Sequence, residues 1–248
     1  MGARIEVDGR PATVDDLAHP VLVNFGHFTS MQVRGRRVRG LRHHLDRLTA
    51  ANRELFGADL DPELVRALIR RALTDTDDAS VRVNAYRREE EGPVSLMVTV
   101  RAPYEFPAAP LRLQTVLYGR PVPHIKHVGS FGQAYYGRLA ARQAYDDALL
   151  TGEDGAISET TVANFGFFVD GAVHWPAAPC LVGTTMALLG GERRPIRVAD
   201  LPGLAGAFVA NSNGIAPVGQ IDSLTLPVDE HLMRTVLDRY GEVPWDLI

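Results

Sequence analysis

The spacing of apolar residues predicts two amphipathic helices in the first hundred residues. From Leu41 the apolar residues recur every three or four positions as far as Leu55, and Gly57 follows at a position typical of a helix end. A second helical pattern begins at Asp61, which can cap the helix, and Pro62 suits its first turn.

Short apolar runs bounded by turn residues predict the strands of the same part of the chain. The Asp8-Gly9 turn closes the first run, and a charged stretch at residues 87–92 joins the last two. The predicted strands are residues 4–7, 21–25, 28–33, 80–86 and 93–101. With the two helices, they predict a small mixed domain.

Prolines separate this part from the rest of the chain. Pro103, Pro107 and Pro110 predict a linker before a strand at residues 111–117. The patterns that follow predict a helix at 131–148, strands at 156–158, 165–169 and 172–175, a glycine turn that leads into a helix at 183–189, and a last helix at 229–240. We therefore expect a small α+β domain at 1–105, a linker and first strand at 106–120, and a larger domain at 121–248.

Composition and charge exclude a disordered tail protein and a strongly charged partner. The chain has 248 residues, of which 46% are hydrophobic and 23% charged, and its formal charge is -4. This balance gives no overall attraction to nucleic acid or to a membrane. The first residues lack an apolar signal core, no apolar run reaches about 18 residues, and the single cysteine, Cys180, cannot form an internal disulfide. We expect a soluble, cytoplasmic protein.

The basic residues single out one position. Of the 26 basic side chains, Lys126 is the only lysine and the other 25 are arginine. A lysine amine can lose its proton when it is desolvated and then attack a carbonyl, whereas arginine stays charged. Lys126 is therefore a candidate nucleophile, and its survival by chance on a loop is the alternative.

Three further polar segments are candidates for ligand binding, and each has a structural alternative. Gly183-Thr184-Thr185 at a helix start suits a phosphate, unless a threonine simply caps the helix. Glu159 follows a short strand. Three interpretations are open for it: a surface residue, which is the commonest case, an ion-pair partner, or a group that holds a proton on a bound heterocycle. Residues 211–214, Asn-Ser-Asn-Gly, form an ordinary turn or contact a ligand.

Other kinds of site are disfavoured. The arginine-rich residues 34–47 lack the interleaved aromatic residues of a nucleic-acid surface, although Arg47, beside Leu48, is expected to point inward. His43 and His44 have no neighbours that complete a metal-site spacing, so no metal is predicted. The chain has neither a Gly-x-Ser-x-Gly elbow nor a P-loop, which disfavours serine hydrolases and nucleoside triphosphatases.

Taken in chain order, these segments resemble the pyridoxal-phosphate enzymes of fold type IV, the class IV aminotransferase family. The resemblance rests on Arg47 in His44-Leu45-Asp46-Arg47-Leu48, Lys126 after Pro123, Ile157-Ser158-Glu159 with Asn164 five residues later, Gly183-Thr184-Thr185, and residues 211–218. The family includes branched-chain and D-amino-acid aminotransferases and aminodeoxychorismate lyases. The resemblance implies a small α+β domain, a larger α/β domain with a mixed, barrel-like sheet, a cofactor between them, and a homodimer.

The resemblance also implies a role for each candidate residue. Lys126 would hold pyridoxal 5'-phosphate as an internal aldimine and move the proton of the substrate as the catalytic base and acid. Glu159 would sit beside the pyridine nitrogen and keep it protonated. The remaining cofactor-binding residues would be Arg47, Thr184 and Thr185 at the phosphate, together with Asn211.

Three positions depart from the family pattern. Phe131 stands where members commonly have a tyrosine, Thr160 where glycine is common, and Met186 where many have an arginine. We expect these departures to alter the tuning of the cofactor more than its binding.

The predicted reaction moves an amino group between an amino acid and a 2-oxo acid. Thr29 and Ser30 are similar to the lyase branch, so pyruvate elimination from aminodeoxychorismate, which gives 4-aminobenzoate, is the alternative. A cofactor-free binding protein on the same scaffold is a further alternative. We expect small-molecule substrates and no nucleic-acid or membrane partner.

Overall fold

The computed structural model describes residues 2–89, 91–107 and 109–248, which divide into two units. Unit 1 comprises Met1–Tyr104, Ile125–Gly129 and Pro244–Ile248, and unit 2 comprises Glu105–His124 and Ser130–Val243. Each unit has its own sheet and its own hydrophobic core. The short segment that carries Lys126 therefore belongs to unit 1, although the chain on both sides of it belongs to unit 2.

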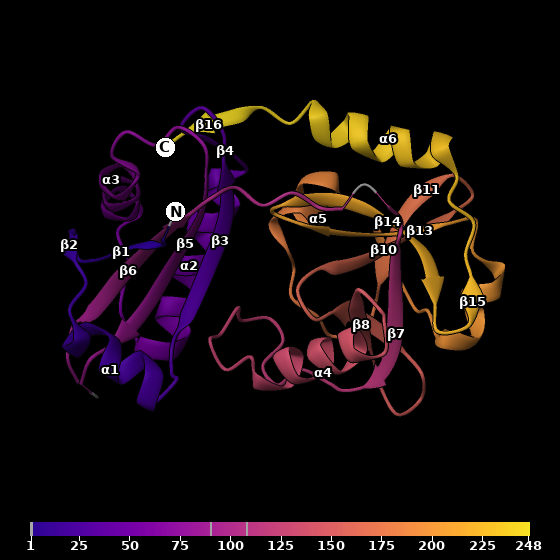
Figure 1. Cartoon of the computed structure of the whole chain (residues 1–248), viewed down its shortest axis with the longest axis horizontal. Helices are drawn as coiled ribbons and strands as arrows, with labels where there is room; N and C mark the ends of the chain where they lie inside the picture. The colour runs from indigo at the N-terminus through magenta and orange to yellow at the C-terminus, as the bar shows by residue number, and fades with distance from the viewer. Residues whose placement is uncertain (1, 90, 108) are drawn as a thin grey trace. The chain divides into compact units, whose positions relative to one another are not determined.

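The described residues of unit 1 form an antiparallel five-stranded sheet in the order β2-β1-β6-β5-β3 (Figure 1). Alternate residues of the strands face the core, as expected for a sheet with one buried face. The strands are β1 (Arg4–Val7), β2 (Arg10–Pro11), β3 (His27–Val33), β5 (Ala79–Arg87) and β6 (Val94–Arg101).

Two helices cover the buried face of this sheet, as their apolar spacing predicts. Helix α2 (Leu41–Phe56) packs on β3, and α3 (Pro62–Leu73) packs on β1, β5 and β6. Gly57 ends α2 in the left-handed conformation, and the Asp61 carboxylate caps α3 by accepting the Glu63 amide hydrogen. A small additional sheet, which the patterns did not predict, pairs β4 (Arg37–Arg39) with β16 (Trp245–Leu247).

The segment before β3 is a helix, so the strand predicted at residues 21–25 is wrong. Helix α1 (Val14–Leu22) begins with a capping box between Thr13 and Asp16. The apolar residues at its end stay exposed, so they have no core in which a strand could bury them. The hydrogen bonds of the helix cap therefore determine the structure of this segment, and its short apolar run does not form a strand.

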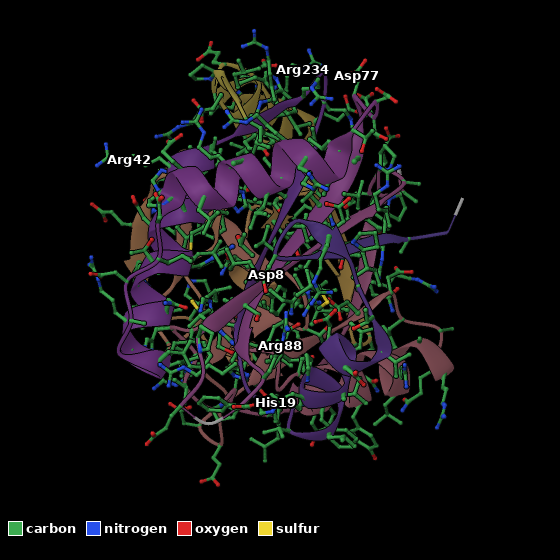
Figure 2. All side chains as sticks on the ribbon, turned by 90° about the vertical axis from the view of Figure 1, so that its left-hand side faces the viewer. Asp8, His19, Arg42, Asp77, Arg88 and Arg234 are labelled. Carbon is green, nitrogen blue, oxygen red and sulfur yellow. The ribbon has the colours of Figure 1, made fainter. Side chains whose placement is uncertain are left out.

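Charged side chains of unit 1 lie mostly on its surface, and Figure 2 labels several of them. Arg88 pairs with Asp8 at 2.9 Å and with Asp16 at 3.0 Å, which ties α1 to the end of β5. Arg42 projects away from α2 (Figure 2) and makes only an exposed ion pair with Asp46, at 3.5 Å. This part of the arginine-rich stretch is a solvated helix surface.

The described residues of unit 2 form a closed ring of six strands. The ring runs β10-β13-β14-β7-β8-β9 and returns to β10. The pairs β14–β7 and β7–β8 are parallel and the other pairs are antiparallel, which confirms the predicted mixed, barrel-like sheet. The ring strands are β7 (Leu111–Leu117), β8 (Asp147–Thr151), β9 (Ile157–Thr160), β10 (Asn164–Val169), β13 (Ala207–Asn211) and β14 (Gly214–Ile221). Outside the ring lie β11 (Ala172–Pro176), β12 (Glu192–Arg194) and β15 (Leu224–Thr225).

Helices and apolar side chains complete unit 2. The helices are α4 (Phe131–Arg142), α5 (Thr184–Leu189), the 3-10 helix η1 (Val198–Gly203) and α6 (Glu230–Gly241). Leu113, Phe165 and Val218 belong to the core that the ring encloses, and Trp175 and Met233 belong to a second cluster beneath α6. Among the described helices, none combines the length and the apolar character that crossing a bilayer requires.

The helix predicted at residues 131–148 is too long. It ends at Arg142, and Ala144 adopts a left-handed backbone (φ 65°) that a continuing helix cannot contain. The following apolar residues form β8 instead. Strands β13 and β14 were not predicted either, although the polar residues between them do form a turn.

Candidate functional site

Lys126 lies on a segment that pairs with the outer edge of the unit 1 sheet. The Phe28 amide donates to the Lys126 carbonyl at 2.8 Å, and the Val128 amide donates to the Gly26 carbonyl at 2.9 Å. A Cβ atom at Gly26 (φ 155°) would lie 2.6 Å from the Ala85 carbonyl oxygen, so this close approach requires glycine. Main-chain bonds therefore fix the backbone of the only lysine.

The Lys126 amine shares an aromatic ring with a second cation. Its Nζ atom lies 4.9 Å from the centroid of the Phe28 ring, and the guanidinium carbon of Arg82 lies 3.5 Å from the same centroid. Burial, with a smaller contribution from Arg101, lowers the pKa of Arg82 to about 10. Two cations therefore lie at the Phe28 ring, one from β5 and one from the segment that pairs with β3, which favours an anionic ligand.

Arg47 contacts a buried polar pair on the opposite side of the same strand. Its Nη2 atom donates to the Thr29 hydroxyl at 2.7 Å, and this hydroxyl lies 2.7 Å from Nδ1 of His44. Thr29 and His44 are both buried. Burial, and then the positive charges of Arg47 and Lys126, lower the pKa of His44 well below its ordinary value of 6.5. His44 is thus a neutral, buried residue of α2.

Glu159 is a buried ion-pair partner in unit 2 and not the surface residue that is the commonest case. Its Oε1 atom lies 2.9 Å from Nε of Arg120, and its Oε2 atom accepts the Leu181 amide hydrogen at 3.3 Å. The side chains of Arg120 and Glu159 are only 4% and 7% exposed. The carboxylate therefore has a fixed orientation and a neutralising partner, as a buried charge requires.

Arg120 is a site residue that sequence reasoning missed. It also donates to the Pro123 carbonyl, so it holds the chain that leaves β7. Arg120 and Glu159 are 39 residues apart, and no spacing pattern connects them. Their contact arises only once the barrel has set the position of β9 relative to the end of β7.

The Gly183-Thr184-Thr185 segment does not cap its helix through a threonine. Gly183 is the N-cap of α5, and no side chain caps this end. The Thr185 hydroxyl donates to the Asn211 carbonyl at 2.7 Å. The Thr184 hydroxyl is buried and has no hydrogen-bond partner among the described residues, so an acceptor from a ligand would satisfy it.

The candidate residues of unit 2 form one connected group. Glu159 and Asn164 are paired across β9 and β10, and a Cβ atom at Gly183 would collide with Oδ1 of Asn164. Asn211 supplies the carbonyl that accepts from Thr185, and its own side chain shapes the turn after β13 by accepting the Asn213 amide hydrogen at 2.8 Å. The predicted turn at residues 211–214 therefore also supports α5.

The three residues that depart from the family pattern have different surroundings. Phe131 begins α4, is 80% exposed and stacks on Tyr135 at 6.1 Å. Met186 is buried in α5. The Thr160 hydroxyl exchanges hydrogen bonds with the main chain of Ala163, so it stabilises the β9–β10 hairpin.

Residues 26–221 match the family model for amino-transferase class IV. The chain belongs to the class IV aminotransferase family. The match spans the segments that carry Arg47, Lys126, Glu159 and the Gly183 turn, and it confirms the resemblance found in the sequence. A search of curated proteins by sequence finds no match.

Solved structures confirm that this class IV aminotransferase family member has the fold-type IV architecture. A provisionally assigned 4-amino-4-deoxychorismate lyase from Legionella pneumophila is 20% identical, with a TM-score of 0.83 over 94% of this chain and 96% of that chain. A hypothetical aminotransferase from Mycobacterium tuberculosis, solved in its PLP-bound form, is 22% identical, with a TM-score of 0.82 over 97% and 98%. A branched-chain aminotransferase from Thermoproteus uzoniensis, solved with norvaline, is 19% identical, with a TM-score of 0.82 over 97% and 94%. At these identities the likeness shows the fold.

Proposed function

We propose that this class IV family member is a pyridoxal-phosphate enzyme that moves an amino group between an amino acid and a 2-oxo acid. The observation that carries the proposal is the chain's only lysine, held by main-chain bonds at the edge of β3. The family match and the PLP-bound relative from Mycobacterium tuberculosis support the choice of cofactor. The homodimer implied by the resemblance stays a prediction.

The residues present fit this cofactor. Pyridoxal phosphate has an aldehyde, a phosphate and a pyridine nitrogen, so its site needs an amine, hydrogen-bond donors and a carboxylate. Thr184 offers a buried hydroxyl without a partner among the described residues, and Glu159 offers a buried carboxylate with a fixed orientation. In our proposal Lys126 supplies the amine and Glu159 the carboxylate. The phosphate donors are the Arg47 guanidinium, the Thr184 hydroxyl and the main-chain amide of Thr185, whose own hydroxyl donates to the Asn211 carbonyl. Asn211 thereby supports the phosphate segment.

Each residue then has a defined task. Bound pyridoxal phosphate supplies a sink for the electrons released at the α-carbon of the substrate. The Lys126 amine would remove the proton from that carbon and return it at the C4' carbon of the cofactor, as general base and then general acid. Glu159 would hold a proton at the ring nitrogen with its negative charge, and Arg120 holds Glu159 in place.

The burial and the hydrogen bonds of the Thr29 hydroxyl favour amino transfer over the lyase alternative. Thr29 was half of the signal for the lyase branch, but its hydroxyl is buried and bonded to Arg47 and His44. An internal structural task therefore accounts for this residue, and it is not needed to explain pyruvate elimination.

The test compares the wild type with Lys126→Ala and, as a matched control, with Arg42→Ala, which removes an exposed cation of α2. We expect wild type and control to turn yellow with pyridoxal phosphate, and borohydride reduction should leave a pyridoxyl group on Lys126, as mass spectrometry would show. Lys126→Ala should lose this adduct and roughly 10⁴-fold in turnover. Undiminished turnover in Lys126→Ala would refute the assignment.

The same preparation separates the alternatives. Amino transfer predicts a spectral change with an amino acid that a 2-oxo acid reverses. The lyase alternative predicts pyruvate release from aminodeoxychorismate. A wild-type protein that binds no cofactor would favour the cofactor-free binding protein.

A further inference from the structure

Three side chains beneath β3 form a short hydrogen-bonded chain inside unit 1. Thr29 extends from β3 toward α2, and His44 and Arg47 lie three residues apart on α2, so they share one face of the helix. Nδ1 of His44 and Nη2 of Arg47 each lie 2.7 Å from the Thr29 hydroxyl oxygen. The Thr29 and His44 side chains are almost fully buried, at 0% and 1% residue exposure.

The chemistry of these groups fixes the direction of the first hydrogen bond. A guanidinium only donates, so the Thr29 oxygen accepts from Arg47. Burial keeps His44 neutral by lowering its pKa. We assign the imidazole proton to Nε2, so that Nδ1 accepts the hydroxyl hydrogen of Thr29. A protonated His44 would direct a second donor at the same oxygen and would place another positive charge beside Arg47.

With this tautomer, His44 determines which way the Thr29 hydroxyl points. A threonine hydroxyl rotates freely, and it can aim either its hydrogen or a lone pair at a neighbour. Because Nδ1 of His44 takes the hydrogen, a lone pair faces Arg47. The oxygen is uncharged, so this contact orients the guanidinium without neutralising it. The contrast is Arg120, which a carboxylate both orients and neutralises.

We propose that Thr29 and His44 are positioning residues that aim the Arg47 guanidinium at the phosphate of the cofactor. The inference rests on the proposed function, because it takes Arg47 to be a phosphate ligand. Thr29 and His44 themselves touch neither cofactor nor substrate in this proposal. Their effect should therefore depend on the phosphate group of the ligand and not on its ring.

The test measures the dissociation constants of pyridoxal phosphate and of pyridoxal, which lacks the phosphate, for one set of variants. Thr29→Val keeps the shape of the side chain and removes the hydroxyl. Thr29→Ser restores the hydroxyl. His44→Leu removes the acceptor, and His44→Asn retains an acceptor near the position of Nδ1. Thr99→Val, at a buried threonine of β6 in the same sheet, is the matched control.

We expect Thr29→Val to weaken pyridoxal phosphate about 10- to 100-fold, the range for a hydrogen bond to a charged group, and to change pyridoxal binding less than about threefold. Thr29→Ser should restore binding to within about threefold of the wild type. His44→Leu should act in the same direction as Thr29→Val but more weakly, and His44→Asn should recover part of the loss. Thr99→Val should leave both constants unchanged.

Two results would overturn the inference. Equal weakening of both ligands by Thr29→Val would mean that Thr29 supports the fold of the site in general, and unchanged binding of pyridoxal phosphate would mean that Arg47 needs no such support.

The wild type separates this inference from the proposed function. A wild-type protein that binds neither ligand refutes the proposed function, and the positioning role with it. If the wild type binds pyridoxal phosphate but Thr29→Val shows no phosphate-specific loss, only the positioning role fails. Thermal melting of each variant identifies unfolding. Should Thr29→Val unfold, the pair His44→Leu and His44→Asn decides the question, because only the first removes the acceptor at Nδ1.

Discussion

Unit 1 and unit 2 hold their proposed site residues by different means. In unit 1 a neutral hydroxyl and a neutral imidazole orient Arg47, and two cations share the Phe28 ring. In unit 2 a full positive charge, that of Arg120, holds a full negative charge, that of Glu159, away from solvent. In the first arrangement Thr29 and His44 bring no negative charge to Arg47, whereas in the second the charges of Arg120 and Glu159 neutralise each other.

This difference makes the two units sensitive to different changes. A buried ion pair is costly to break on one side only, because the remaining charge stays buried without a partner. A buried neutral imidazole is instead sensitive to acid, because the unfolded chain takes up a proton that the folded chain cannot accept. Loss of a charge should therefore damage unit 2, and a fall in pH should damage unit 1.

The largest expected effect comes from Glu159→Gln, which removes the charge and keeps the shape. We expect single-turnover proton abstraction to slow by roughly three powers of ten, because the ring nitrogen loses its anionic partner. The matched control is Glu153→Gln on the exposed turn before β9. A near-normal rate in stopped-flow measurements of Glu159→Gln would mean that this carboxylate does not face the ring nitrogen.

The next effect is on stability and concerns the ion pair itself. Arg120→Met should lower the free energy of unfolding of unit 2 by about 3 to 5 kcal/mol, because the Glu159 carboxylate stays buried without the guanidinium of Arg120. The double variant Arg120→Met, Glu159→Gln should regain much of this loss. Urea unfolding followed through Trp175, the only tryptophan of unit 2, measures both variants. Additive losses in the double variant would contradict the coupling of the pair.

The smallest of these effects concerns pH and unit 1. Burial lowers the pKa of His27 to about 4, against 6.5 for the unfolded chain, and a hydrogen bond with Asn52 offsets part of this shift. Between these two pKa values the unfolded state binds the proton and the folded state does not, so stability falls as pH falls through this window. Between pH 7.5 and pH 5.5 each such histidine should cost about 1 kcal/mol.

His27→Gln tests this difference between the units. We expect it to reduce the loss of stability between pH 7.5 and pH 5.5, and His44 should account for much of the remainder. The control is Arg42→Gln, which replaces an exposed side chain of α2 and should leave the pH dependence unchanged. Trp245, the only tryptophan of unit 1, reports the unfolding of that unit. An unaltered pH dependence in His27→Gln would contradict the assignment.

Local patterns were enough to predict much of the fold. Helices α2 and α3 repeat their apolar residues with the period of a helix and carry a terminating glycine or a capping aspartate, so neighbouring residues contain the signal. Lys126 was identified as a candidate nucleophile only because it is the single lysine of the sequence. The mixed barrel followed from the family resemblance, whereas strands β13 and β14, on either side of the polar turn at residues 211–214, were not predicted.

The parts that were missed depend on which surfaces meet. Arg120 reaches Glu159 only through the closed ring, and Thr29 reaches His44 only because α2 covers that face of β3. Neither contact can be predicted from the spacing of residues along the chain. The helix predicted through residue 148 failed for a local reason, because the left-handed Ala144 separates two apolar runs that look continuous.

The ring of unit 2 also sets an order for its own assembly. The other pairs of neighbouring strands in the ring are closer together in the sequence than β7 and β14 are. Strand β7 can therefore complete its pairing only after β14 has been made. Asp222 accepts hydrogen bonds from the amide and hydroxyl of Thr115, 107 residues earlier, at 2.9 and 2.6 Å. Bringing distant segments together costs chain entropy before the contacts between them form and offset that cost. On the ribosome, β7, the first ring strand to be translated, therefore remains without one neighbour until β14 has been made.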